Sequence, residues 1–509
     1  MMELDKIQPN KLDDFIKNNL QPCGFNVEVR EAVNRICEFL RNQCFTKQPN
    51  VKVIRAVKGG SSGKGTALKN SSDADIVVFL SCFTSFQLQR DTRHEILEEI
   101  QTMLDKCSKS LAYSVNNINV NIIKQSITSP KSLSFELQSR KSSESVSFDV
   151  LPTYDVLTPQ YNTSEAHLEL IQFANHNEIT EGEFSACFTE LQRRFVKRQF
   201  PKVKDLIRLL KYWYKEFVKP RKSELRNGAR LPAKYALELL TIYAWEEGNH
   251  KERFDMAEGF CTVLELICRY QELCIYWTDY YDVNNEDLVK FLIKKLHNRR
   301  PIILDPADPT GNVASSDGWS VMEDEARKWL GMPCVSNVEA WVVEPVKTFG
   351  VTVTALDGNQ FQQNASIYSK VSQIKHSIQK EWNIPALQQR LLFEDTILND
   401  QKTLLDSKIF FDAKIQLLTL GVMEIFVRKD GRDQTIQVLP DDQVSSLKDK
   451  IESLQRIQRS QYYLTFQSTP LEDARTLKSY GIKHHSTILV NLRLRGGTEI
   501  QLPNTVDPN

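Results

Sequence analysis

The sequence predicts a multidomain α+β protein with a mixed α/β lobe, a mostly helical lobe and two small strand-and-helix units. At 509 residues the chain is longer than one hydrophobic core usually supports. β-Rich runs cluster within residues 51–156, whereas helical periodicity dominates residues 160–335. Beyond Cys334, the last cysteine, two segments of similar length each follow the order strand, turn, strand, helix, strand.

The first lobe is expected over residues 1–156. Residues 9–45 have the apolar spacing of two amphipathic helices. Five strands are then expected, near residues 51–57, 74–80, 118–124, 132–138 and 145–151.

The helical lobe is expected over residues 157–340. Its leucines recur at helical spacing, and an aromatic stripe made by Trp213, Tyr243 and Trp245 accompanies them. We interpret this stripe as core packing rather than as a cofactor-binding face. A nucleotide would then occupy the cleft between the two lobes.

A glycine-rich loop, GGSSGKGT at 59–66, precedes two aspartates that begin an apolar run, Asp73 and Asp75. Side chains two residues apart on a strand point to the same face, so both carboxylates can reach one divalent cation. The backbone N–H groups of the loop can bind phosphate oxygens. This combination is typical of metal-dependent chemistry on a nucleoside triphosphate.

The loop differs from a Walker A motif at two positions. Lys58 stands where the first glycine belongs, and Gly65 replaces the Ser or Thr that follows the lysine. A nucleotidyltransferase is therefore favoured over a P-loop ATPase, and Asp149 is the candidate third carboxylate on a neighbouring strand. Any one aspartate alone would fit a solvated strand end equally well. The loop and the aspartate pair together favour a functional site.

These motifs resemble those of the 2′-5′-oligoadenylate synthases. The resemblance covers about residues 1–340 and continues through FTELQR at 188–193, LLKYWY at 209–214, YALELL at 235–240 and ILDPADPTGN at 303–312. It implies that a nucleotide 2′-hydroxyl attacks the α-phosphate of donor ATP, with release of pyrophosphate. It also implies a role in antiviral innate immunity.

The resemblance assigns Asp73, Asp75 and Asp149 to a catalytic triad that binds two Mg²⁺ ions. Nucleotide contacts are implied for four further positions: Ser61, Arg208, Lys211 and Lys234. Lys234 departs from the family, which has a glutamine there, so the details of substrate binding are expected to differ.

Activation by double-stranded RNA is also implied. Residues 193–222 carry twelve basic residues against Asp205 and Glu216, although the net charge of the whole chain is zero. From the charge run alone, a solvated helical face would be equally compatible. Five positions match the RNA-facing surface of the family: Arg41, Lys58, Arg193, Lys197 and Lys202. Duplex RNA would be recognised by its shape and backbone, and its binding is expected to close the lobes.

Residues 349–421 and 423–497 each resemble ubiquitin, through IPALQQRLLF at 384–393 in the first and MEIFV at 423–427 with LRLRGG at 492–497 in the second. Two β-grasp domains are therefore expected. A tail, residues 498–509, follows the Gly-Gly pair, which favours a docking module for an unidentified protein over a conjugated modifier. We interpret His484 and His485 as a loop feature rather than a metal site.

A synthase-like unit followed by two ubiquitin-like domains resembles the 2′-5′-oligoadenylate synthase-like proteins. Some relatives of this architecture have lost the catalytic residues, so a non-catalytic RNA-binding adaptor is the alternative to an enzyme. The presence of all three aspartates favours the enzyme.

Ten cysteines without a CxxC pair, and no apolar run long enough to span a membrane, predict a reduced, cytoplasmic protein. A monomer is expected, since Cys334-Val335-Ser336 departs from the Cys-Phe-Lys tract of oligomeric synthases.

Overall fold

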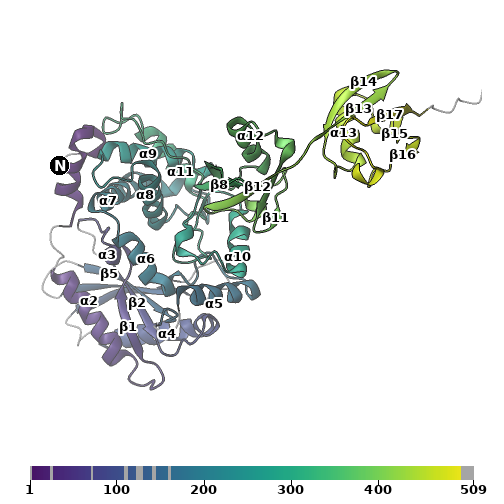
Figure 1. Ribbon diagram of the computed structural model, residues 1–509. Helices are drawn as coiled ribbons and strands as arrows, with labels where there is room; N and C mark the ends of the chain where they lie inside the picture. The colour runs from purple at the N-terminus through teal and green to yellow at the C-terminus, as the bar shows by residue number, and fades with distance from the viewer. Residues whose placement is uncertain are drawn as a thin grey trace, which may run out of the picture. The chain divides into compact units, whose positions relative to one another are not determined.

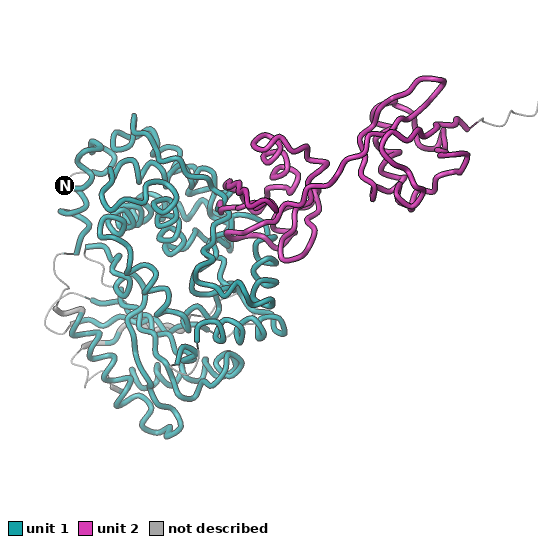
Figure 2. Tube along the Cα trace, viewed as in Figure 1, with its two compact units in different colours: residues 1–347 teal, residues 348–509 magenta. Residues whose placement is uncertain are grey.

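The computed structural model describes residues 3–22, 27–69, 73–107, 113–121, 130–139, 145–158 and 162–493. The chain forms two compact units, residues 1–347 and 348–509 (Figure 2). Each unit is described by itself.

A five-stranded sheet organises the first lobe, in the order β1-β2-β5-β4-β3. Its strands are β1 (Val53–Lys58), β2 (Asp73–Leu80), β3 (Tyr113–Asn121), β4 (Ser132–Ser139) and β5 (Ser145–Thr153). β2 and β5 pair in parallel, and the other neighbours pair antiparallel. The parallel pair places residues of two distant segments, 73–79 and 147–153, directly side by side.

β3 starts earlier than the strand expected at 118–124, of which residues 122–124 lie outside the described part of the chain. The run of asparagines near 116–119 has low strand propensity, which hid the N-terminal half of the strand. Pairing with β4 on both sides of an irregularity between Asn116 and Asn119 overrides that propensity.

Two helices pack against this sheet, α2 (Val27–Phe39) and α4 (Phe86–Cys107) (Figure 1). Ile36 of α2 and Leu97 of α4 share one core with Ile76 of β2. The N-terminal segment behaves differently: α1 (Leu12–Phe15) and the turn after it, Ile16–Leu20, pack into the core of the helical lobe.

The helical lobe contains α5 (Thr163–His176), α6 (Thr189–Lys197), α7 (Pro201–Trp213), α8 (Lys234–Gly248), α9 (Met256–Cys268), α10 (Glu286–Leu296) and α11 (Trp319–Trp329). α8 is buried on nearly all sides from Ala236 to Trp245. Trp213, Tyr243 and Trp245 are all buried in this core, which confirms their interpretation as packing residues.

The second unit contains two domains of the same topology, which confirms two ubiquitin-like β-grasp folds. The first is built from β8 (Thr348–Ala355), β9 (Gln360–Ser366), α12 (Val371–Trp382), β10 (Gln389–Phe393), β11 (Thr396–Ile397) and β12 (Ala413–Thr419). The second is built from β13 (Met423–Lys429), β14 (Arg432–Val438), α13 (Val444–Gln455), β15 (Tyr462–Phe466), β16 (Thr469–Pro470) and β17 (Thr487–Leu492). The Gly496-Gly497 pair and the tail lie outside the described residues.

The two β-grasp domains differ at one position of the strand that follows the helix, β10 in the first domain and β15 in the second. In the second domain the Asn491 side chain donates to the Thr465 hydroxyl at 2.9 Å. In the first domain Leu392 is half-buried at the corresponding position.

Within the described ranges, no helix combines the length and apolar character needed to cross a bilayer.

Candidate active site

The three predicted aspartates lie side by side on β2 and β5. Asp75 stands directly opposite Asp149 in the parallel ladder, and Asp73 precedes Asp75 on the same face of β2. Asp73 is exposed, whereas Asp75 and Asp149 are half-buried. The strand pairing therefore brings together carboxylates that are 74 residues apart in the chain.

Burial and the charges of the neighbouring carboxylates both change the pKa of Asp75. Burial raises the pKa of Asp75 to about 6, and the negative charges of Asp149 and Asp73 act in the same direction. Lys64 and Lys211 oppose this shift. A bound cation would relieve the repulsion among these oxygen ligands, and Mg²⁺ prefers such ligands.

The local contacts of the aspartates fit a metal site. The Ser134 hydroxyl donates a hydrogen bond to Asp149 Oδ1 and so orients that carboxylate. Gly60 approaches so closely that a Cβ there would lie 1.5 Å from Asp75 Oδ2. The oxygens of the three aspartates do not all lie within 4.8 Å of one another, however, so ligation of a shared ion would require them to draw together.

The glycine-rich loop forms a short helix, α3 (Gly60–Lys64), beside β2. The Gly59 N–H donates to the Asp75 carbonyl at 2.8 Å, which fixes the loop to the strand that carries the aspartates. Gly60 has φ +52°, a conformation that favours glycine. A Cβ on Gly63 would lie 2.3 Å from the Lys58 carbonyl. Ser61 sits in the first turn of this helix, and its predicted phosphate contact stays a prediction.

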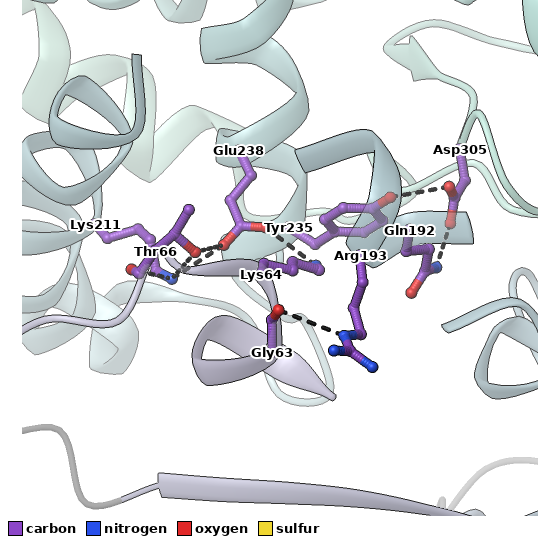
Figure 3. Close-up of polar contacts among 9 residues, drawn as sticks. All are labelled: Gly63, Lys64, Thr66, Gln192, Arg193, Lys211, Tyr235, Glu238 and Asp305. Atoms are coloured by element: carbon purple, nitrogen blue, oxygen red, sulfur yellow. Dashed lines mark hydrogen bonds and ion pairs between the residues drawn. The ribbon is translucent and has the colours of Figure 1, made fainter. Parts of the chain in front are cut away.

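A buried ion cluster connects the loop to the helical lobe (Figure 3). Glu238 of α8 accepts hydrogen bonds from Lys64 Nζ at 3.0 Å, Lys211 Nζ at 3.0 Å and the Thr66 hydroxyl at 2.8 Å. Glu238, Lys64, Lys211 and Thr66, the Glu238 cluster, are all buried. One carboxylate thus pairs with two ammonium groups, one from each side of the interface.

The charges of the Glu238 cluster depend on one another. Burial alone would raise the pKa of Glu238, but Lys64, Lys211 and the Thr66 hydroxyl outweigh it and lower this pKa to about 2. Burial lowers the pKa of Lys211 despite Glu238, and the charges of Lys64 and Lys234 add to that effect.

The residues predicted to contact the triphosphate are engaged with the loop itself. Arg208 donates to the carbonyls of Gly65 at 2.7 Å and Ala67 at 3.1 Å, and it pairs with Asp205 at 2.6 Å. Lys211 donates to the Thr66 carbonyl at 3.1 Å. A phosphate contact from either residue would require an exchange of partners. Lys234 is exposed in the first turn of α8.

Two of the five predicted RNA-facing residues, Arg41 and Lys58, belong to the sheet lobe, and the other three belong to the helical lobe. Burial raises the pKa of the Cys37 thiol, and the positive charges of Arg41 and Lys58 oppose this rise. Arg193 and Lys197 lie one turn apart on α6, and Arg193 Nε reaches the Gly63 carbonyl at 3.4 Å. Lys202 pairs with Asp13 at 3.1 Å.

The sequence interpretation gave no role to Glu238 and Tyr235, which contact the loop residue Lys64. It also gave none to Gln192 and Asp305, which bond each other beside the loop, and it named Lys64 and Thr66 only as parts of the loop motif. One signal could have found Glu238. It is a lone acid in an otherwise apolar stretch of α8, and such a residue is rarely buried without a partner.

Two other features lie apart from this site. A cavity of about 470 Å³ is lined by parts of α5 and α10, and no predicted site residue lines it. Glu424, His484 and His485 place ligand atoms within 4.8 Å of one another. His484 Nδ1 already accepts the Glu424 N–H at 2.9 Å, and we retain the interpretation as a loop feature.

Comparison with protein families identifies three kinds of domain. Residues 37–138 match a family described as nucleotidyltransferase domain, and residues 160–350 match one described as 2′-5′-oligoadenylate synthetase 1, domain 2, C-terminus. Residues 351–419 and 425–495 each match the ubiquitin family.

Individual relatives agree with this assignment. The 2′-5′-oligoadenylate synthase-like protein 2 of Mus musculus is 38% identical over 498 residues, which cover 94% of this chain and 97% of that protein. The 2′-5′-oligoadenylate synthase 1A of Rattus norvegicus is 45% identical over 65% of this chain and 94% of its own length. The 2′-5′-oligoadenylate synthase 2 of Mus musculus is 45% identical, and the match spans 45% of its length.

The close approach of Gly60 to Asp75 predicts that Gly60→Ala displaces the Asp75 carboxylate. The matched control is Gly65→Ala, because Gly65 also has positive φ, +78°, but a Cβ added there would have no neighbouring atom within 4 Å. Both variants should lose about 1 kcal/mol to backbone strain. Mg²⁺ titration should show weakened binding for Gly60→Ala only; equal weakening in both variants would contradict the prediction.

The Glu238 cluster predicts a pH-dependent stabilisation. Because the pKa of Glu238 lies near 2 and below its usual 4.5, this stabilisation of about 3 kcal/mol is complete above about pH 4.5 and is lost as the pH falls towards 2. Denaturant unfolding should therefore show Glu238→Gln destabilised at pH 7, with a difference from wild type that shrinks below pH 4.5. A difference that is constant with pH would exclude ionised Glu238 as its source.

Proposed function

The chain belongs to the 2′-5′-oligoadenylate synthase-like family, and from this premise we propose that it makes 2′-5′-linked oligoadenylates from ATP when double-stranded RNA is bound. The observation that carries the proposal is the pairing of Asp75 with Asp149 beside the glycine-rich loop. Partly buried carboxylates that repel one another beside such a loop are typical of functional sites.

In the proposed reaction, Asp73, Asp75 and Asp149 would hold two Mg²⁺ ions, which when bound stabilise charge on the attacking and leaving oxygens. The backbone amides of α3 and Ser61 would orient the donor triphosphate. Lys211 and Arg208 would exchange loop carbonyls for phosphate oxygens, and Lys234 would add positive charge at the start of α8.

RNA would act through the lobe interface. Arg41 and Lys58 belong to the sheet lobe, whereas Arg193, Lys197 and Lys202 belong to the helical lobe. A duplex that binds all five favours the arrangement in which the two groups fit it together, which is a population shift. That shift would draw the three aspartates closer to one another.

The same proposal includes a cytoplasmic location, a role in antiviral innate defence and a monomeric protein. It assigns catalysis to residues 1–156 and 157–340. The ubiquitin-like domains, 349–421 and 423–497, would dock a separate protein.

A second candidate function is a non-catalytic RNA-binding adaptor. It is favoured by the two complete β-grasp folds and by the engagement of Lys211 and Arg208 with the loop rather than with an open phosphate site. The two functions share the RNA surface and differ in whether the aspartates take part in chemistry.

The assay that separates the two candidates supplies ATP and Mg²⁺ with and without duplex RNA and detects 2′-5′-linked products. We expect RNA-dependent synthesis, reduced more than about 100-fold in Asp75→Ala because a direct metal ligand is lost. Asp287→Ala, an exposed aspartate of α10, is the matched control and should remain active. Absence of product from wild type under both conditions would leave the adaptor function.

The RNA surface predicts that Arg193→Glu with Lys197→Glu weakens RNA binding and lowers its salt dependence by about one unit of slope per lost phosphate contact. The control is Lys290→Glu with Lys294→Glu, which makes the same charge change at the same spacing on α10. Filter binding over a salt series measures both. Equal weakening of RNA binding in the two double variants would mean that the change in net charge, and not the loss of this surface, causes the effect.

A further inference from the structure

Asp305 is a fully buried carboxylate that no step of the proposed reaction uses. Its two oxygens divide their hydrogen bonds between different elements (Figure 3). Oδ2 accepts from Gln192 Nε2 of α6 at 2.5 Å. Oδ1 accepts from the Tyr235 hydroxyl of α8 at 3.0 Å and from the Ala307 N–H at 2.9 Å. The Asp305 side chain thus links two helices, α6 and α8.

The backbone around Asp305 is held firmly. It follows β7 (Ile302–Ile303), which pairs with β6 (Cys274–Ile275). The Asp305 N–H donates to the Gly311 carbonyl at 2.9 Å, and the Tyr281 hydroxyl donates to the Asp305 carbonyl. The carboxylate is therefore a fixed point against which α6 and α8 are placed.

The two partners of Asp305 are next to the contacts that hold α3. Arg193, which directly follows Gln192, reaches the Gly63 carbonyl. The Lys64 ammonium lies over the Tyr235 ring, 3.5 Å from the ring centroid, in a cation–π contact. One contact with α3 thus comes from Tyr235, a partner of Asp305, and the other comes from Arg193, the residue next to its partner Gln192.

We propose that Asp305 is a positioning residue, which sets α6 and α8 so that together they hold the glycine-rich loop against Asp75. The proposal rests on the proposed function only for its catalytic consequence. Asp305 touches neither the aspartate cluster nor the predicted phosphate contacts; it acts through Gln192 and Tyr235.

The state of the carboxyl agrees with this role. Burial raises the pKa of Asp305 to about 6, and the charge of Asp308 adds to the shift, while the three hydrogen bonds oppose it. An ionised carboxylate accepts from all three donors. An asparagine could keep the same links, because the Gln192 amide can turn to accept from the new side-chain N–H₂ group.

The test compares Asp305→Ala with Asp308→Ala in the full chain. Asp308 is an equally buried aspartate three residues away, but it bonds Ser185 and Thr310 and contacts neither Gln192 nor Tyr235. Amide hydrogen exchange of residues 59–66 reports the loop directly and needs no catalysis. We expect exchange there to rise roughly tenfold in Asp305→Ala, equal to about 1.4 kcal/mol, and to stay unchanged in Asp308→Ala.

Two further variants sharpen the test. Asp305→Asn should restore slow exchange in the loop. Tyr235→Phe keeps the ring beside Lys64 but removes the bond to Asp305, so it should raise exchange partially, and it carries the test if Asp305→Ala does not fold. If the protein proves active, the KM for ATP should rise about tenfold in Asp305→Ala, with a smaller effect on kcat.

Unchanged exchange in folded Asp305→Ala and in Tyr235→Phe would overturn the proposal. So would an equal rise in Asp308→Ala, since the effect would then be general loss of stability. A protein that makes no oligoadenylate but shows the exchange pattern would retain the positioning role and lose only the proposed function.

Discussion

The arrangement of the first unit depends on one buried carboxylate. Glu238 lies in an apolar helix and would be costly there if it were alone, because an unpaired buried charge loses its hydration without compensation. Lys64 and Lys211 are buried as well and have the same requirement. Each of the three is stable only because of the others. The loop that approaches Asp75 is consequently fixed to the helical lobe by charge rather than by apolar packing.

This constraint relates the two halves of the candidate site. The aspartates belong to the sheet, and most of the basic residues belong to helices, so the proposed chemistry would need both lobes. In the observed arrangement the lysines neutralise a carboxylate of the protein. A triphosphate offers the same kind of charge to the same groups, and an exchange of one anion for another can therefore accompany substrate binding.

Much of this organisation could be predicted from the sequence. Asp73 and Asp75 were recognisable as a pair because strand periodicity fixes which side chains share a face. Asp149 was recognisable only as a candidate on a neighbouring strand, and the two β-grasp domains were recognisable because their signatures are local. The Glu238 cluster was not predictable in this way. Its members are separated by up to 174 residues, and a periodic pattern does not predict which buried lysine contacts which buried acid. β3 was misplaced for a related reason, because pairing with β4 decided a segment whose own propensity is low.

The N-terminal segment gives the chain an unusual route through the first unit. Leu12, Phe15 and Ile16 lie in the same core as α7, α8 and α9, although the whole sheet lobe lies between them in sequence. The helical lobe is therefore discontinuous, and the sheet lobe is inserted within it. An emerging chain can complete the sheet lobe early, but the first residues must wait for the helical lobe before they find their partners. In sequence order the chain passes from the helical lobe to the sheet lobe and back again, so two covalent connections rather than one tie the lobes to each other.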